Sequence, residues 1–109
     1  MKAVNNPNFS TLPDFGNFPK GAEGKYAIDI YDAIKRMMPY AKGVSAKSYD
    51  FDEQGRETTL DYPRIMAIVE EANYHGFVGI EYEGSRLSEP EGIKATKRLL
   101  EQIRAKGSV

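Results

Sequence analysis

Charged side chains lie near the ends of three apolar stretches of this sequence. Asp14 closes the first stretch, Lys47 lies near the end of the second, and Glu81 and Glu83 end the third. Carboxylates bind hard divalent cations or move a proton next to a carbonyl, and an ammonium group neutralises them. Burying such charges is costly unless they are paired or bind a metal. We therefore interpret Asp14, Glu81 and Lys47 as parts of one site.

Each of these residues also has a purely structural interpretation. A carboxylate at a strand end sometimes only pairs with a neighbouring lysine or a loop amide. For Asp14 and Glu81 we favour a functional role, whereas for Lys47 the two interpretations have equal weight. Glu83 lies where a strand becomes a loop, and a loop-stabilising salt bridge explains it better than catalysis. His75 falls in a predicted turn at the opposite end of the sheet, where we expect it to be exposed.

Three strand–loop–helix units position these side chains. The predicted strands are residues 8–14, 43–48 and 77–83, and the predicted helices span residues 25–38, 61–73 and 88–106. Residues two apart in a strand share a face, which places Ser45 with Lys47 and Glu81 with Glu83. Strands that alternate with helices predict an α/β fold with a parallel sheet, and ligands bind at the carboxyl ends of such strands.

Local signals mark the ends of the three helices. Pro39 ends the first helix, and Asp61 is a good N-cap for the second. Ser88 and Glu91 form a capping box at the start of the third helix, and Gly107 ends it. The predicted buried stripes contain Ala27, Ile30, Tyr31, Ile34 and Met38, then Ile65, Ile68, Val69 and Ala72, then Ile93, Leu99, Leu100 and Ile103.

Composition narrows the classes of function. The 109 residues carry 15 basic and 16 acidic side chains, a net charge of −1, which gives no electrostatic case for nucleic acid or an anionic membrane. No apolar run approaches the ~20 residues that span a bilayer. The absence of cysteine excludes disulfides and thiolate metal sites and allows a cytoplasmic location, which we expect.

The motifs together resemble the last three strands of the xylose isomerase-like TIM barrels. That family includes sugar phosphate isomerases and epimerases, ketose 3-epimerases and type IV-like AP endonucleases. Residues 11–18 resemble the sixth strand, residues 43–48 the seventh, and residues 76–84 the eighth, which the closing helix follows. The resemblance implies that residues 1–109 are a single partial domain, about three carboxyl-terminal β/α units of a (β/α)₈ barrel.

The resemblance also implies a divalent metal, Mn²⁺ or Mg²⁺, held by Glu, Asp, His and Glu. Asp14 matches the Asp ligand, and Glu81 matches the last Glu, which in the epimerases also moves a proton. Ser45 stands at the His position and the fifth strand is absent, so only two of the four ligands remain and we expect weak metal affinity. The Lys47 ammonium offers another way to neutralise Asp14 and Glu81. Asn17 lies where relatives place a residue that contacts substrate.

The predicted function is therefore a fragment of a sugar or sugar phosphate isomerase or epimerase. It would act by metal-assisted proton transfer next to a sugar carbonyl, with Glu81 and Lys47 as catalytic candidates and Asn17 and Glu83 as substrate-binding candidates. A non-catalytic carbohydrate-binding remnant is the alternative, which Ser45 favours. Near-neutral charge argues against a repair protein of the AP endonuclease type.

Three parallel strands cannot close a barrel, which takes about 250 residues. An open parallel sheet of this size exposes two edges and half of a core. We therefore expect the chain to associate with copies of itself or with the missing part of a barrel. The expected ligand is a small-molecule sugar, and no nucleic acid or membrane partner is expected.

Overall fold

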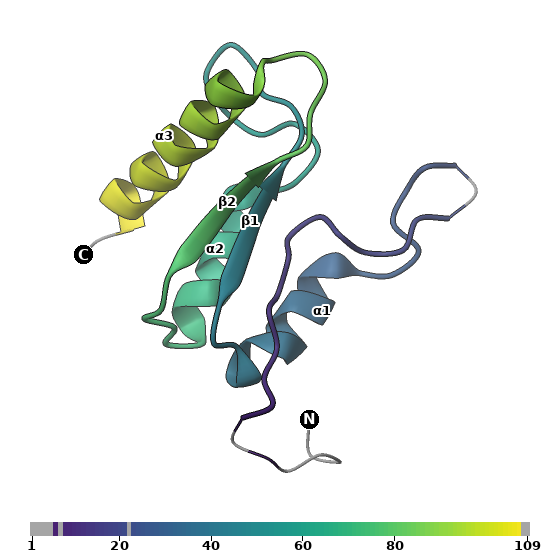
Figure 1. Cartoon of the computed structure of the whole chain (residues 1–109), viewed down its shortest axis with the longest axis vertical. Coiled ribbons are helices and arrows are strands. Elements are labelled where there is room, and N and C mark those ends of the chain that lie inside the picture. Colours follow the sequence, from purple (N-terminus) through teal and green to yellow (C-terminus); the bar gives the residue numbers. More distant parts are fainter. Residues whose placement is uncertain (1–5, 7, 22, 108–109) are drawn as a thin grey trace.

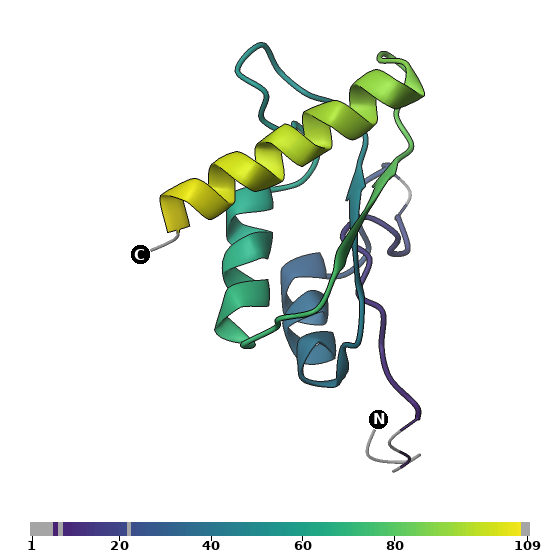
Figure 2. The same cartoon turned by 60° about the vertical axis from the view of Figure 1, so that its left-hand side comes forward.

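Two parallel strands, β1 (Val44–Ser48) and β2 (Val78–Tyr82), lie side by side at the centre of the fold (Figure 1). The computed structural model describes residues 6, 8–21 and 23–107. The helices are α1 (Ile30–Met37), α2 (Tyr62–Glu71) and α3 (Glu89–Gly107), with a short 3₁₀ helix, η1 (Met38–Tyr40), after α1. Figure 2 shows all three α-helices on the same side of the sheet. The α/β class with parallel strands is thus confirmed, and the barrel stays a prediction.

The predicted first strand, residues 8–14, is wrong as a regular strand, because this extended segment makes only isolated bridges, one to β1 and one to Ala41 just before it. Isolated parallel bridges join Thr11 to Ala41 and Asp14 to Ser45. Thr11 and Asp14 are three residues apart, whereas their partners Ala41 and Ser45 are four residues apart. The register therefore slips by one residue between the two bridges. Pro13 lies within the slip and lacks the N–H that a regular ladder needs, although its carbonyl accepts from the Ser45 N–H at 2.9 Å.

The first helix begins five residues later than predicted, at Ile30. The Asp29 carboxylate is its N-cap and accepts from the Tyr31 N–H at 3.0 Å. The preceding residues form a turn that an antiparallel bridge between Lys20 and Tyr26 closes, so they are not available to the helix. The prediction that Ala27 belongs to the buried stripe is wrong, because this residue lies between the turn and α1 and its side chain is exposed.

The caps predicted for the other two helices are confirmed. Asp61 accepts from the Arg64 N–H at 3.1 Å, and Ser88 accepts from the Glu91 N–H at 3.3 Å. The expectation that Ile93 faces inward is wrong, because this side chain is 45% exposed. The other predicted inward residues are confirmed, since Leu99 is buried and Leu100 and Ile103 pack against the core.

Gly92 decides how α3 lies against β2. A Cβ atom at this position would come within 2.3 Å of the Tyr82 ring, so only glycine allows the helix to approach so closely. The residues one and two helical turns further along this face, Thr96 and Leu99, are buried. The Thr96 hydroxyl lies 2.7 Å from the Ser48 hydroxyl of β1 and shares a buried hydrogen bond with it.

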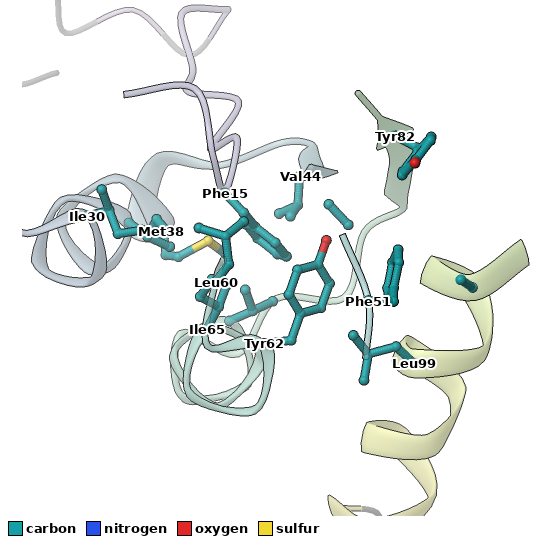
Figure 3. Close-up of a cluster of buried hydrophobic side chains, with 14 residues drawn as sticks. Phe15, Ile30, Met38, Val44, Phe51, Leu60, Tyr62, Ile65, Tyr82 and Leu99 are labelled. Atoms are coloured by element: carbon teal, nitrogen blue, oxygen red, sulfur yellow. The ribbon is translucent and has the colours of Figure 1, made fainter. Parts of the chain in front are cut away.

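The core lies between the sheet and the helices (Figure 3). Phe15, Ile34, Tyr62 and Ile65 are each at most 1% exposed. The rings of Phe15 and Tyr62 meet edge to face, with centroids 5.5 Å apart and planes at 81°. Each fully buried side chain of this size stabilises the fold by ~1.5–3 kcal/mol. Because Phe15 directly follows Asp14, this packing also holds the extended segment against β1.

Candidate functional site

Alternation along the strands separates an apolar face from a polar one. Val44 and Ala46 of β1 are buried in the core beneath the helices. Ser45 and Lys47 point to the opposite face, and the strand register places Lys47 directly beside Glu81 of β2. The predicted sharing of faces is therefore confirmed. The polar face is the one that the three helices leave uncovered (Figure 2).

Four of the predicted site residues meet in what we call the Lys47 cluster, which consists of Lys47, Asp14, Glu81 and Glu83. The Lys47 side chain is only 4% exposed. Its Nζ donates to Glu81 Oε1 at 2.7 Å, donates to Glu83 Oε1, and lies 3.9 Å from Asp14 Oδ2. The two glutamate side chains are about half exposed, at 51% and 53%. The cluster thus combines an enclosed cation with accessible carboxylates.

Gly16 makes the burial of Lys47 possible. A Cβ atom there would lie 2.9 Å from Lys47 Cγ and 2.7 Å from Tyr49 Cε2, so the chain passes over both side chains only as glycine. The Gly16 N–H donates to Asp14 Oδ1 at 3.0 Å, which orients this carboxylate. From the core side, the buried Tyr62 hydroxyl donates to the Lys47 carbonyl.

The charges in the cluster stabilise one another. Burial alone would lower the pKa of Lys47, but hydrogen bonds to Glu81 and Glu83 and the negative charge of Asp14 raise it above the ordinary lysine value. The hydrogen bond from Lys47 lowers the pKa of Glu81. At neutral pH Lys47 is therefore a fixed cation that donates hydrogen bonds and does not act as a base, and Glu81 is ionised.

The donor set does not fit the divalent metal that the resemblance implies. The Lys47 ammonium occupies the position on which the carboxylates of Asp14, Glu81 and Glu83 converge. Ser45, at the implied histidine position, donates its hydroxyl to Glu81 Oε2 at 3.4 Å. Within the described part of the chain, no three acidic or imidazole side chains are arranged to hold a metal ion. The metal-ligand roles of Asp14 and Glu81 remain predictions.

The other candidates lie around this cluster. Asn17 is exposed immediately after Gly16, at the edge of the site. The salt bridge expected for Glu83 is present, with Lys47 as its partner, and the Glu83 N–H donates to the Ser48 carbonyl at 2.9 Å. His75 is exposed, as expected. Substrate contacts by Asn17 and Glu83 remain predictions.

Comparison with known proteins found a match to part of this chain. A C-glycoside deglycosidase alpha subunit from Arthrobacter globiformis is 37% identical over 65 residues. The match covers 57% of this chain and 18% of that protein, so the chain spans a small part of the relative's length. No family model matches the chain.

The matched protein is a subunit of a sugar-processing enzyme, as the sequence analysis expected in general terms. The specific resemblance to xylose isomerase-like barrels remains a prediction. Among the described residues, none of the helices is long and apolar enough to cross a membrane. The expected cytoplasmic location remains a prediction as well.

Two side chains next to the cluster, Tyr49 and Glu57, were not among the predicted site residues. Tyr49 follows Lys47 by two residues, so the alternation that paired Ser45 with Lys47 was a signal for it. Its hydroxyl donates to the Gly16 carbonyl at 2.9 Å. Glu57 is 8% exposed and accepts from the Tyr49 N–H at 2.8 Å. No periodic signal marks Glu57, because the loop after β1 must fold back before it reaches Tyr49.

The lowered pKa of Glu81 makes a prediction about the pH dependence of stability. A carboxyl whose pKa is lower in the folded state stabilises the fold above its unfolded pKa, and loses this contribution as the pH falls through the folded value. Wild type should therefore be more stable than Glu81→Gln at pH 7, with a difference that shrinks below about pH 4. Urea unfolding at several pH values measures it.

The matched control for this prediction is Glu70→Gln, on α2 beneath the opposite face of the sheet. This variant also removes one carboxylate, but at a position away from Lys47, so the Glu81→Gln result is read relative to it. A Glu81→Gln difference that stays constant from pH 7 to pH 3 would mean that the Lys47–Glu81 pair does not stabilise the fold.

Removing the ammonium should create a cation site. In Lys47→Met the carboxylates of Asp14, Glu81 and Glu83 lose their shared positive charge, so we expect Mn²⁺ affinity at least roughly tenfold higher than in wild type. Isothermal titration calorimetry measures it, and Lys94→Met on the exposed surface of α3 is the control. Tighter Mn²⁺ binding by wild type than by Lys47→Met would show that lysine does not replace a metal here.

Proposed function

We propose that this chain is the carboxyl-terminal portion of a sugar-processing enzyme that moves a proton next to a sugar carbonyl, as isomerases and epimerases do. The observation that carries the proposal is the Lys47 cluster. It places an enclosed cation and three carboxylates at the carboxyl ends of parallel strands, where α/β enzymes bind their ligands. The similarity to a subunit of a C-glycoside deglycosidase supports a sugar as the substrate.

The Lys47 ammonium would supply the electrophile. A carbonyl oxygen that accepts a hydrogen bond from Nζ develops negative charge when the neighbouring C–H bond breaks, and a fixed cation stabilises this charge in the transition state. Lys47 suits this role because its raised pKa keeps it protonated and its enclosed side chain keeps it in place. Because the fold already holds Nζ in place, no further free energy is needed to orient this donor in the transition state.

Glu81 would accept the proton. Its carboxylate is ionised, half exposed and 2.7 Å from Nζ, so it lies beside a carbonyl that binds to Lys47. The C–H electron pair forms the double bond of an enediolate, whose negative oxygen is held by Lys47. For an isomer, the proton of the neighbouring hydroxyl moves to this oxygen and Glu81 returns its proton to the former carbonyl carbon. For an epimer, a water on the opposite face protonates the same carbon, and Glu81 releases its proton to solvent.

Substrate binding also adjusts the strength of this base. When the substrate carbonyl oxygen accepts a hydrogen bond from Nζ, the hydrogen bond from Nζ to Glu81, which lowers the pKa of Glu81, becomes weaker. Its pKa then rises toward the ordinary value, which makes it a better proton acceptor in the complex than in the free protein. Glu83 and Asn17, at the edge of the cluster, would bind sugar hydroxyls.

A non-catalytic carbohydrate-binding site is the second candidate. Ser45 at the implied histidine position favours it, because a hydroxyl is a poor metal ligand and the remaining carboxylates can bind sugar hydroxyls without chemistry. The net charge of −1 gives no support to a nucleic-acid repair function.

We also propose that the uncovered sheet face is closed by further strands, from copies of this chain or from the rest of a barrel. Leu12 and Phe77 are 63% and 93% exposed, and strand alternation places both on the face that carries Lys47. Apolar side chains gathered in this way mark association surfaces. Light scattering should give more than one copy per particle if the chain pairs with itself. A mass of one copy would leave the remaining barrel as the proposed partner.

Proton exchange tests the catalytic proposal. The 109-residue chain, incubated with an aldose or ketose in D₂O, should exchange the hydrogen on the carbon next to the carbonyl, as measured by ¹H NMR of the sugar. Lys47→Met and Glu81→Gln should each lower the exchange rate roughly a hundredfold, because each removes one partner of the transfer. Glu70→Gln on α2 should leave the rate unchanged.

Amide NMR on the same samples separates the two candidate functions. Sugar-induced shifts at Lys47 and Glu81 without proton exchange would support the carbohydrate-binding alternative. A chain whose amides do not respond to any sugar would contradict both candidates.

A further inference from the structure

Tyr49 lies between the two segments that bring carboxylates to the Lys47 cluster. On one side its hydroxyl donates to the carbonyl of Gly16, in the extended amino-terminal segment, at 2.9 Å. On the other side its backbone carbonyl lies against Gly84, where a Cβ atom would come within 1.8 Å of this oxygen. Gly84 directly follows Glu83. Both carboxylate-bearing segments therefore pass close to Tyr49, and each does so at a glycine.

The position of Tyr49 is fixed by the loop that follows β1. Its N–H donates to the buried Glu57 carboxylate at 2.8 Å. The same carboxylate accepts from the Thr59 hydroxyl at 2.8 Å and from the Leu60 N–H at 3.0 Å. Hydrogen bonds to an ionised acceptor are stronger than those between neutral groups, so Glu57 is a firm anchor. Tyr49 is thus held independently of the two segments that it contacts.

Two phenol hydroxyls hold the Gly16 carbonyl, those of Tyr49 and Tyr26, which donate to it at 2.9 and 3.0 Å. Burial raises the pKa of Tyr26 to about 12 and also raises that of Tyr49, so both hydroxyls keep their protons at pH 7. The three heavy atoms nearest to a Cβ atom at Gly16 would belong to Tyr49 and Lys47. The extended segment, the Tyr49 ring and the Lys47 side chain are therefore packed directly against one another.

This packing encloses the Lys47 side chain and supplies one of its counter-charges. The Gly16 N–H donates to Asp14 Oδ1 at 3.0 Å, while the other carboxylate oxygen, Asp14 Oδ2, lies 3.9 Å from Lys47 Nζ. If the Gly16 segment moved away from β1, the Asp14 carboxylate would move with it. The hydrogen bond from Tyr49 to Gly16 therefore affects both how well the ammonium is enclosed and how well it is paired.

We propose that Tyr49 is a positioning residue of this site, which holds the Gly16 and Gly84 segments against Lys47 and so keeps the ammonium enclosed and paired. The enclosure of Lys47 does not depend on any substrate. Its consequence for catalysis rests on the proposed function, because an ammonium that moves stabilises the negative charge on a substrate oxygen less well. Tyr49 acts through Lys47, since its own hydroxyl is already bonded to the Gly16 carbonyl.

Acetylation of lysine tests the proposal without a sugar. The 109-residue chain is treated with a trace of acetic anhydride, and mass spectrometry of its peptides gives the rate at Lys47 relative to the exposed Lys94. In wild type Lys47 should react much more slowly than Lys94, because only an accessible, unprotonated amine reacts. In Tyr49→Phe the relative rate at Lys47 should rise roughly fivefold, because loss of the hydrogen bond makes open states more populated.

The matched control is Tyr74→Phe. The Tyr74 hydroxyl also donates to a backbone carbonyl, that of Phe77 at 2.5 Å, but it does so at the opposite end of β2 from the site. In this variant the relative rate at Lys47 should remain as in wild type. Equal increases in Tyr49→Phe and Tyr74→Phe would show a general loss of stability and overturn the proposal. An unchanged rate in Tyr49→Phe would overturn it as well.

Proton exchange of the sugar in D₂O gives a second readout and separates this inference from the proposed function. In Tyr49→Phe the rate at saturating sugar should fall roughly fivefold, whereas KM should change by less than about twofold, because a misplaced electrophile affects mainly the transition state. Faster acetylation of Lys47 in a chain that exchanges no sugar proton would support the positioning role and contradict the proposed function. Exchange at equal rates in wild type and Tyr49→Phe would support the proposed function and overturn the role of Tyr49.

Discussion

The Lys47 ammonium, enclosed on one face of the sheet and shared among three carboxylates, is the interaction on which the site depends. Three segments meet here: β1 carries Lys47, the extended amino-terminal segment carries Asp14, and β2 with the residue that follows it carries Glu81 and Glu83. An unpaired ammonium this deeply enclosed would be strongly destabilising. The need to pair it therefore holds the carboxyl ends of the three segments together.

The apolar face of the sheet provides the rigidity that such a cluster needs. Tyr62 packs edge to face on Phe15 and donates its hydroxyl to the Lys47 carbonyl, so one core residue supports both Lys47 and the segment that carries Asp14. The hydrogen bond between Ser48 and Thr96 fixes the end of β1 against α3. Side chains that are positioned from behind in this way keep their geometry when a ligand binds in front.

The Lys47 cluster presents hydrogen-bond acceptors and a fixed donor side by side. Glu81 and Glu83 are half exposed and accept hydrogen bonds, whereas the Lys47 ammonium only donates them. Tyr49 packs against Gly16 next to this cluster, and the Lys20 ammonium lies over the Tyr49 ring.

The sequence by itself determined the features that depend on neighbouring residues. Strand alternation assigned Lys47, Glu81 and Glu83 to one face, and the caps at Asp61 and Ser88 followed from side-chain chemistry within one helical turn. These predictions were confirmed because alternation and capping are local properties of the chain.

Only the tertiary structure decided what occupies the centre of the site. The motifs left both a metal and the Lys47 ammonium as partners for Asp14 and Glu81. The fold brings the ammonium to these carboxylates, because the strand register puts Lys47 beside Glu81 and Gly16 lets the chain pass above it. Contacts between distant segments also explain the register slip at Pro13 and the exposure of the Ile93 side chain. Each depends on contacts between segments that are distant in sequence, and no periodic pattern within one segment encodes them.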